Sequence, residues 1–318
     1  MTKIDQLRAP LLVTWQLTRN CDLACVHCCT DSAPGKRLPG ELDAGEAMQL
    51  AHEIIANQVP YVMLCGGEPL VVPHFLDVAE ALGAAGVQLK IETNGQQFDA
   101  RIAERLSRLP VRSVQISLDA DSDDVYRRQR PGGSLAKAHA ACEAVRAVNL
   151  PLEITFAPTR LNIDEIEAVI DRARTFGAFR FNTGKLMRIG TAARLWNKLE
   201  PSDEQYRHML DVLQLQARAI EDSTELCYLP FSIEDGLQRS FQEPPATMLV
   251  LPDGRVKVTA ALPYVCADLR RQTLAQAWEA YRGAWRDTEV LADVHHAIAD
   301  ASLHSRANNW KVLALANV

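Results

Sequence analysis

Residues 15–28 read WQLTRNCDLACVHC, in which Cys21, Cys25 and Cys28 form a C-x3-C-x2-C motif. The motif follows directly on a strand-like run at 11–18. Three thiolates on one tight loop can ligate three irons of a cubane cluster and leave the fourth iron open. The spacing also allows a zinc site with Cys29 or His27 as fourth ligand, or a group of buried structural cysteines.

The sequence around this motif alternates between strand-like and helical segments as far as residue 190. Strands are predicted at 11–18, 61–64, 88–93, 113–118, 152–157 and 179–187, with amphipathic helices at 44–56, 74–85, 99–109, 136–148 and 163–176. Such alternation indicates βαβ units and a parallel sheet. Six strands are too few for an eight-stranded barrel, so we expect an α/β fold of the partial (β/α)6 barrel type. Its site should lie at the carboxyl ends of the strands.

The pattern changes after residue 200. A long helix is predicted at 202–221 with Ser202 as its N-cap, followed by a hairpin turning at Asp253-Gly254 and a helix at 274–285. We therefore expect a barrel over 1–200 and a small α+β region over 201–318 that covers one end of the sheet.

Four further motifs follow the cysteines in order. They are GGEP at 66–69 after the second strand, ETNG at 92–95 ending the third, SLD at 117–119 ending the fourth, and RPGGS at 130–134. Together with residues 15–28, these motifs resemble the signatures of the radical S-adenosylmethionine (SAM) superfamily. The resemblance covers residues 10–190.

This resemblance implies two cofactors and a reductant. The cofactors would be SAM and one [4Fe–4S] cluster held by Cys21, Cys25 and Cys28. The implied chemistry is hydrogen-atom abstraction by a 5′-deoxyadenosyl radical. It needs an external one-electron donor of the flavodoxin or ferredoxin type.

The resemblance also assigns SAM contacts to residues that follow the strands, namely His27, Gly66, Gly67, Glu68, Asn94, Ser117 and Arg130. The two glycines and Glu68 would surround the methionyl amino group, and glycine lets a backbone approach closely. Arg130 would pair with the SAM carboxylate through its planar fork. His27 would pack near the adenine. Ordinary loop and capping roles stay open for Asn94, Ser117 and Arg130.

The segments 188–190 and 250–258 resemble the branch of the family with a C-terminal SPASM or twitch region. That branch holds auxiliary clusters there, yet only Cys227 and Cys266 follow residue 200, and 258–260 contains no cysteine. Two thiols cannot supply a four-ligand cluster. We therefore expect a SPASM/twitch-like region without an auxiliary cluster.

Composition narrows the class of partner. The net charge is −6, with 47% apolar and 23% charged residues, so no basic surface for nucleic acid or an anionic membrane is indicated. No apolar run is long enough to span a bilayer, and the first ten residues do not resemble a signal peptide. We expect a cytoplasmic enzyme, in which eight cysteines, four of them within nine residues, indicate metal chemistry rather than disulfides.

The expected substrate is a small polar molecule, a sugar-acid or nucleoside-like intermediate of natural-product biosynthesis. The first strand begins too early for a preceding leader-binding domain, and a missing auxiliary cluster favours a redox-neutral decarboxylation or epimerisation. Cytosylglucuronic acid decarboxylase of blasticidin-type antibiotic pathways is a similar enzyme. The alternatives are a peptide-modifying maturase served by a separate leader-binding protein, and a zinc-binding scaffold.

Candidate catalytic residues follow from this chemistry. Lys185 and Arg188 come after the sixth strand and could pair with a substrate carboxylate or phosphate. Cys65, Cys227 and Cys266 are candidate thiols for returning a hydrogen atom to the product radical. Surface salt bridges and buried structural cysteines are the alternative roles for these residues.

Overall fold

The computed structural model describes residues 4–219, 224–229 and 232–314. These residues form one 11-stranded sheet in the order β11-β10-β9-β8-β1-β2-β3-β4-β5-β6-β7. The strands are β1 Leu12–Gln16, β2 Tyr61–Cys65, β3 Gln88–Thr93, β4 Val111–Ser117, β5 Leu152–Thr155, β6 Arg180–Gly184, β7 Glu225–Leu229, β8 Thr247–Val250, β9 Arg255–Lys257, β10 Tyr264–Asp268 and β11 Lys311–Val312.

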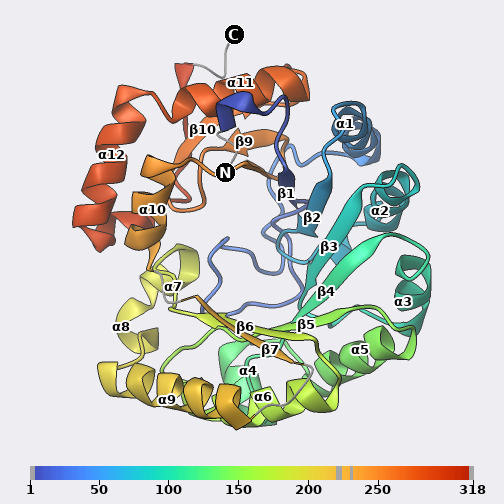
Figure 1. The fold of residues 1–318 in the computed structure, drawn as a ribbon, viewed down its shortest axis with the longest axis vertical. Coiled ribbons are helices and arrows are strands. Elements are labelled where there is room, and N and C mark those ends of the chain that lie inside the picture. The colour runs from blue at the N-terminus through green and yellow to red at the C-terminus, as the bar shows by residue number, and fades with distance from the viewer. Residues whose placement is uncertain (1–3, 220–223, 230–231, 315–318) are drawn as a thin grey trace.

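Strands β1 to β6 lie side by side in chain order, and every neighbouring pair is parallel. The sheet curves around a central space, and the helices lie on its outer side (Figure 1). The predicted α/β fold with a parallel sheet is confirmed, and all six predicted strands are present within a few residues of their expected bounds.

The outer helices are amphipathic. They are α1 Ala44–Ala56, α2 Phe75–Ala84, α3 Ala100–Leu106, α4 Asp123–Gln129, α5 Leu135–Ala147, α6 Ile166–Thr175 and α9 Asp203–Ala219. In α1 the buried residues Ala47, Leu50, Ala51 and Ile54 recur at helical spacing and face the sheet. The helix begins at a capping box, in which the Asp43 carboxylate accepts from the Glu46 N–H.

The two faces of the strands differ in polarity. In β3, Leu89 and Ile91 are wholly buried, whereas Lys90 and Glu92 point the other way and line the interior space. Side chains alternate between the faces of a strand, so the apolar set packs under the helices and the polar set faces inward. Polar side chains of the strands therefore form part of the interior wall of this partial barrel.

The C-terminal region differs from its predicted place. It was expected to cover one end of the sheet, but β7 extends the sheet beside β6 and β8 extends it beside β1. The hairpin predicted at Asp253-Gly254 is confirmed as β8–β9. The helix predicted at 202–221 is α9, and its last two predicted residues lie outside the described part of the chain.

Helices α7 Gly190–Arg194, α8 Trp196–Leu199, α10 Ile233–Gln242 and α12 Thr288–Ala299 lie on the side between the edge strands β7 and β11 (Figure 1), and α11 Leu274–Ala284 packs against β9 and β10. Short 3-10 turns are η1 Ile4–Gln6, η2 Pro69–Val71, η3 Ile163–Glu165 and η4 Ala301–Arg306. None of the helices in the described residues combines the length and apolarity required to cross a membrane.

Candidate active site

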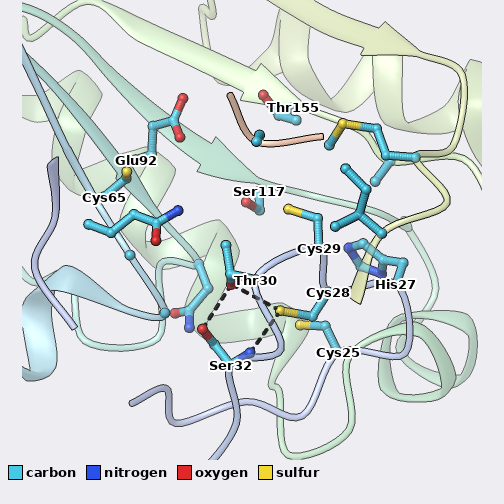
Figure 2. Close-up of a pocket in the computed structure, with 18 of the residues that line it drawn as sticks. Cys25, His27, Cys28, Cys29, Thr30, Ser32, Cys65, Glu92, Ser117 and Thr155 are labelled. Carbon is cyan, nitrogen blue, oxygen red and sulfur yellow. Dashed lines mark hydrogen bonds between the residues drawn. The ribbon is translucent and has the colours of Figure 1, made fainter. Parts of the chain in front are cut away.

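A cavity of about 760 Å³ occupies the interior of the partial barrel. Its wall combines inward-facing side chains of β1 to β6 with the cysteine loop and the C-terminal hairpin. Figure 2 shows the cysteine loop facing residues of three strands, Cys65 on β2, Glu92 on β3 and Ser117 on β4. The site lies where the parallel topology predicted it.

Cys21, Cys25 and Cys28 all line this cavity. The Leu23 N–H approaches the Cys21 sulfur at 3.4 Å, and the Ser32 N–H approaches the Cys28 sulfur at 3.3 Å (Figure 2). Backbone donors of this kind favour thiolates.

Burial opposes ionisation of the same thiols. It raises the pKa of Cys21 to about 12 and that of Cys25 to about 11. Both are therefore neutral thiols near neutral pH, and binding of a metal centre must release their protons.

The cysteine loop is held by backbone contacts from the segment before α5. The Ala24 N–H donates to the Pro131 carbonyl at 3.0 Å, and the Val26 N–H donates to the Gln129 carbonyl at 3.1 Å. No three His, Cys, Asp or Glu side chains in the described ranges group around a point as a single metal ion requires. A cubane cluster does not require its ligands to meet at one point, because each thiolate binds a different iron.

The GGEP glycines fit tightly against the protein's own backbone. A Cβ on Gly67 would lie 2.1 Å from the Asn20 carbonyl oxygen, and one on Gly66, at φ +148°, would lie 2.6 Å from the Thr18 oxygen. The Gly67 N–H donates to Thr18 at 2.7 Å. These glycines also line the cavity. The backbone that they approach closely is that of Thr18 and Asn20, ahead of the first cysteine, and their contact with SAM stays a prediction.

Glu68 lies behind the cavity wall rather than in it. Its side chain is wholly buried and accepts from Thr93 Oγ1 at 2.8 Å, from the Asn94 N–H at 2.8 Å and from the Leu70 N–H at 3.1 Å. Burial nevertheless raises its pKa to about 7. Glu68 therefore joins the loops after β2 and β3, and its expected contact with SAM stays a prediction.

Asn94 and Ser117 both line the cavity at the ends of their strands. The Asn94 amide donates to Asp22 Oδ1 at 2.7 Å and lies 3.6 Å from the Cys21 sulfur. Its own carbonyl accepts from the Gln96 N–H at 2.8 Å. Asn94 thus holds the cysteine loop, while the Ser117 hydroxyl points into the cavity (Figure 2).

Arg130 and His27 meet at Asp119, a wholly buried carboxylate. Arg130 Nε donates to Asp119 Oδ2 at 2.6 Å, and His27 Nε2 lies 3.3 Å from the same oxygen. Arg130 Nη1 is 3.5 Å from the Cys25 sulfur. Burial lowers the pKa of His27 to about 4, so its ring is neutral at physiological pH. Both predicted residues line the cavity, and Asp119 is the positioning residue that orients them.

Of the two predicted cations after the sixth strand, only one lines the cavity. Lys185 is exposed and lines the cavity mouth. Arg188 does not line it, because its guanidinium lies over the Trp196 ring at 5.5 Å. The stacking turns its side chain towards α8. This conformation does not support the expected substrate contact of Arg188, which stays a prediction.

The three candidate thiols also differ in whether they line the cavity. Cys65 lines the cavity (Figure 2), and so does Cys29. Cys266 is wholly buried in β10, with its sulfur 3.5 Å from the Val256 carbonyl. Cys227 lies on β7 near Arg180 and Glu225 and does not line the cavity. A catalytic role for Cys227 or Cys266 is thus not supported by their positions.

Three residues of the site were not anticipated. Asp31 accepts from Arg194 at 2.6 Å and from the Asn308 amide at 2.7 Å. The Asn308 amide also donates to the Cys29 carbonyl at 2.9 Å. Lys257 of β9 lines the same cavity. These contacts join positions between 163 and 279 residues apart, so no local motif could have indicated them.

The residues present fit the cofactors that the motifs imply. Three soft thiol ligands share one wall, as an iron–sulfur cluster requires. On the same cavity, His27 Nδ1 and Thr155 Oγ1 are buried polar atoms without a hydrogen-bond partner in the described part of the chain. Such atoms are suited to a polar ligand, because burial without a partner is costly.

Comparison with known proteins agrees with the motifs of the sequence. The sequence profile of the Radical SAM superfamily matches residues 15–173, half of the chain. Mycofactocin maturase MftC of Mycobacterium ulcerans (strain Agy99) is 36% identical over 208 residues, which are 65% of this chain and 56% of that protein. AdoMet-dependent heme synthase of Methanosarcina barkeri (strain Fusaro / DSM 804) is 29% identical over 222 residues, 68% and 62% of the two chains.

A solved structure extends the likeness over nearly the whole chain. Streptococcus suis SuiB bound to SAM superposes with a TM-score of 0.73 at 15% identity, covering 98% of this chain and 78% of SuiB. At that identity the likeness shows a shared fold. The match to MftC spans little more than half of that protein's length.

Proposed function

This chain belongs to the radical SAM superfamily, and we propose that it is a maturase that abstracts a hydrogen atom from a peptide. It is a radical SAM enzyme that uses a [4Fe–4S] cluster and SAM. When bound, these groups supply a 5′-deoxyadenosyl radical. Cys21, Cys25 and Cys28 would hold the cluster.

The observation that carries the peptide assignment is the 36% identity to MftC, a protein named a maturase. SuiB, which shares the fold, has also been solved bound to its precursor peptide SuiA. The assignment replaces the small-molecule substrate expected from the sequence. That expectation rested in part on the position of the first predicted strand, which does not decide whether the substrate is a peptide.

The cavity wall suits a peptide backbone. It presents amide side chains from several elements, Gln16, Gln115, Asn182 and Asn308 among them. An amide offers both donors and an acceptor, so it can pair with the N–H and C=O groups of an extended chain. The buried Arg130–Asp119–His27 group would then hold one end of the site rigid while a substrate enters.

A small acidic molecule is the second candidate. Lys90, Arg180, Lys185 and Lys257 all line the cavity, and cations recognise carboxylates. The similarity to AdoMet-dependent heme synthase also favours this class. Decarboxylation or epimerisation of a sugar acid would belong here.

The test uses reconstituted enzyme, SAM and a chemical reductant with pools of synthetic peptides and, separately, with sugar acids. Formation of 5′-deoxyadenosine above the substrate-free background and the mass of each product are measured. We expect stimulation and a mass change with peptides. Stimulation by sugar acids alone would contradict the proposal and favour the second candidate. Cys25→Ala is the control, because it should form no 5′-deoxyadenosine with either class.

A further inference from the structure

Lys257 is the last residue of β9 and is held by strands on both sides. It pairs with Leu249 of β8 and with Val265 of β10. The residue is only 2% exposed to solvent, yet it lines the cavity. A side chain fixed in the middle of a sheet has little freedom to turn away, so its ammonium group belongs to the cavity wall.

The ammonium group has one recorded partner. Lys257 Nζ donates to the Ala260 carbonyl at 2.9 Å. An ammonium carries three donors, so two are left without a partner among the described residues. Cys29 and Asp31 face it from the cysteine loop, but neither forms an ion pair with it.

Other cations on the same wall have carboxylate partners. Lys90 pairs with Glu153 at 2.9 Å and Arg130 with Asp119 at 2.6 Å. Arg180 pairs with Glu225 at 2.7 Å. Lys185 makes no such pair but is exposed to solvent. Lys257 is thus a buried cation of the cavity without a carboxylate, in the part of the chain that the structure describes.

A buried, uncompensated charge is costly. Burial accordingly lowers the pKa of Lys257 to about 7. A carboxylate brought into the cavity would supply the missing counter-charge and accept the free donors. A lysine presents a compact point charge and needs no bidentate geometry from its partner.

We infer that Lys257 forms a binding subsite for a carboxylate of the substrate. The inference rests on the proposed function, which makes the ligand an acidic side chain or the C-terminal carboxylate of a peptide. Lys257 would bind the substrate rather than SAM, because the carboxylate of SAM is expected to pair with Arg130.

The experiment compares matched peptide pools on reconstituted enzyme with SAM bound. One pool carries Asp and Glu with an amidated C-terminus, a second carries only a free C-terminal carboxylate, and a third carries no carboxylate. The amount of each peptide pool that stays bound to the enzyme is measured by mass spectrometry. The variants are Lys257→Gln, which keeps a donor to Ala260, Lys257→Arg, which keeps the charge, and the exposed Lys36→Gln as matched control.

We expect at least one carboxylate pool to be retained about tenfold or more above the third pool, the size of effect given by one charge-assisted hydrogen bond. The pool that is retained identifies the source of the carboxylate. Lys257→Gln should abolish the difference, Lys257→Arg should keep part of it, and Lys36→Gln should keep all of it. A preference that survives in Lys257→Gln would overturn the subsite, as would a Lys257→Gln variant that loses SAM affinity instead.

Failure of the proposed function gives a different result. If the wild type retains none of the peptide pools, the peptide assignment is wrong, and glucuronate and glucuronamide are then compared by ligand NMR. If only glucuronate bound, and its binding depended on Lys257, the carboxylate subsite would be supported and its ligand would be a small acid. Equal behaviour of the two probes would overturn the subsite as well.

Discussion

The backbone N–H of Asn94 donates a 2.8 Å hydrogen bond to Oε2 of Glu68. This contact joins the loop after β3 to the loop after β2, and the Asn94 side chain continues it to Asp22 beside the first cysteine. Glu68 therefore supports the cysteine loop through Asn94. The predicted consequence of removing it changes from a loss of SAM contact to a loss of structure.

Replacing Glu68 by Gln should lower the free energy of unfolding by about 1–3 kcal/mol, because its amide nitrogen would face a buried N–H that then lacks an acceptor. Denaturant unfolding measures this. The exposed Glu104→Gln, whose recorded partner is Arg108, is the control and should change little. Unaltered stability in Glu68→Gln would show that the three hydrogen bonds do not support the fold.

Asp31 should determine how firmly the cysteine loop is held. It has φ of 59° and accepts from Arg194 and Asn308. Asn tolerates this left-handed conformation better than Ala does, so Asp31→Ala should lose iron to a chelator faster than Asp31→Asn, and both faster than wild type. The exposed Asp123→Ala should match the wild type. Equal rates in all four proteins would contradict the role of Asp31.

The positions of the thiols predict which of them can serve the product radical. Cys65 lines the cavity, whereas Cys227 and Cys266 do not. With an identified substrate in D2O, a thiol donor would leave one deuterium in the product. We expect Cys65→Ala to form 5′-deoxyadenosine with little product, because the product radical then lacks its hydrogen donor, while Cys227→Ala and Cys266→Ala still form the deuterated product. If Cys227→Ala or Cys266→Ala failed to form the deuterated product, the result would show that the cavity wall moves during turnover.

Lys257 gives a pH dependence of stability. Its pKa is lowered from 10.5 to about 7 by burial, so between these values the unfolded chain binds more protons than the folded chain. Stability then rises with pH across this window. The wild type should therefore gain stability relative to Lys257→Met as the pH is raised above about 7, measured by denaturant unfolding. If the difference in unfolding free energy between the wild type and Lys257→Met did not change with pH, the buried amine would keep its ordinary pKa.

The cysteine loop and six strands could be predicted because their signals are local. Alternating apolar residues indicate each strand, and a run of eight residues contains all three predicted cluster ligands, Cys21, Cys25 and Cys28. The same locality explains why Ser117 and Arg130 were placed correctly on the cavity wall. Ser117 is the last residue of β4, and Arg130 directly follows α4, the helix after that strand.

Contacts across the chain could not be predicted in this way. Asn308 and Cys29 are 279 positions apart, and β7 and β8 join opposite edges of the sheet although they are close in sequence. The glycines at 66 and 67 indicated a close approach, but the sequence did not show that the backbone of Thr18 and Asn20 packs against them. The stacking of Arg188 on Trp196 could not be predicted for a related reason, because it depends on the turn between β6 and α7.

The central claim is that Cys21, Cys25 and Cys28 hold one [4Fe–4S] cluster that supports SAM cleavage. Iron and sulfide are counted per chain after anaerobic reconstitution, together with 5′-deoxyadenosine formed from SAM. The wild type and Cys29→Ala should each hold about four irons and cleave SAM, and Ala at 21, 25 or 28 should abolish both properties. About eight irons in the wild type, or a cluster and SAM cleavage that survive in any of these three variants, would contradict it.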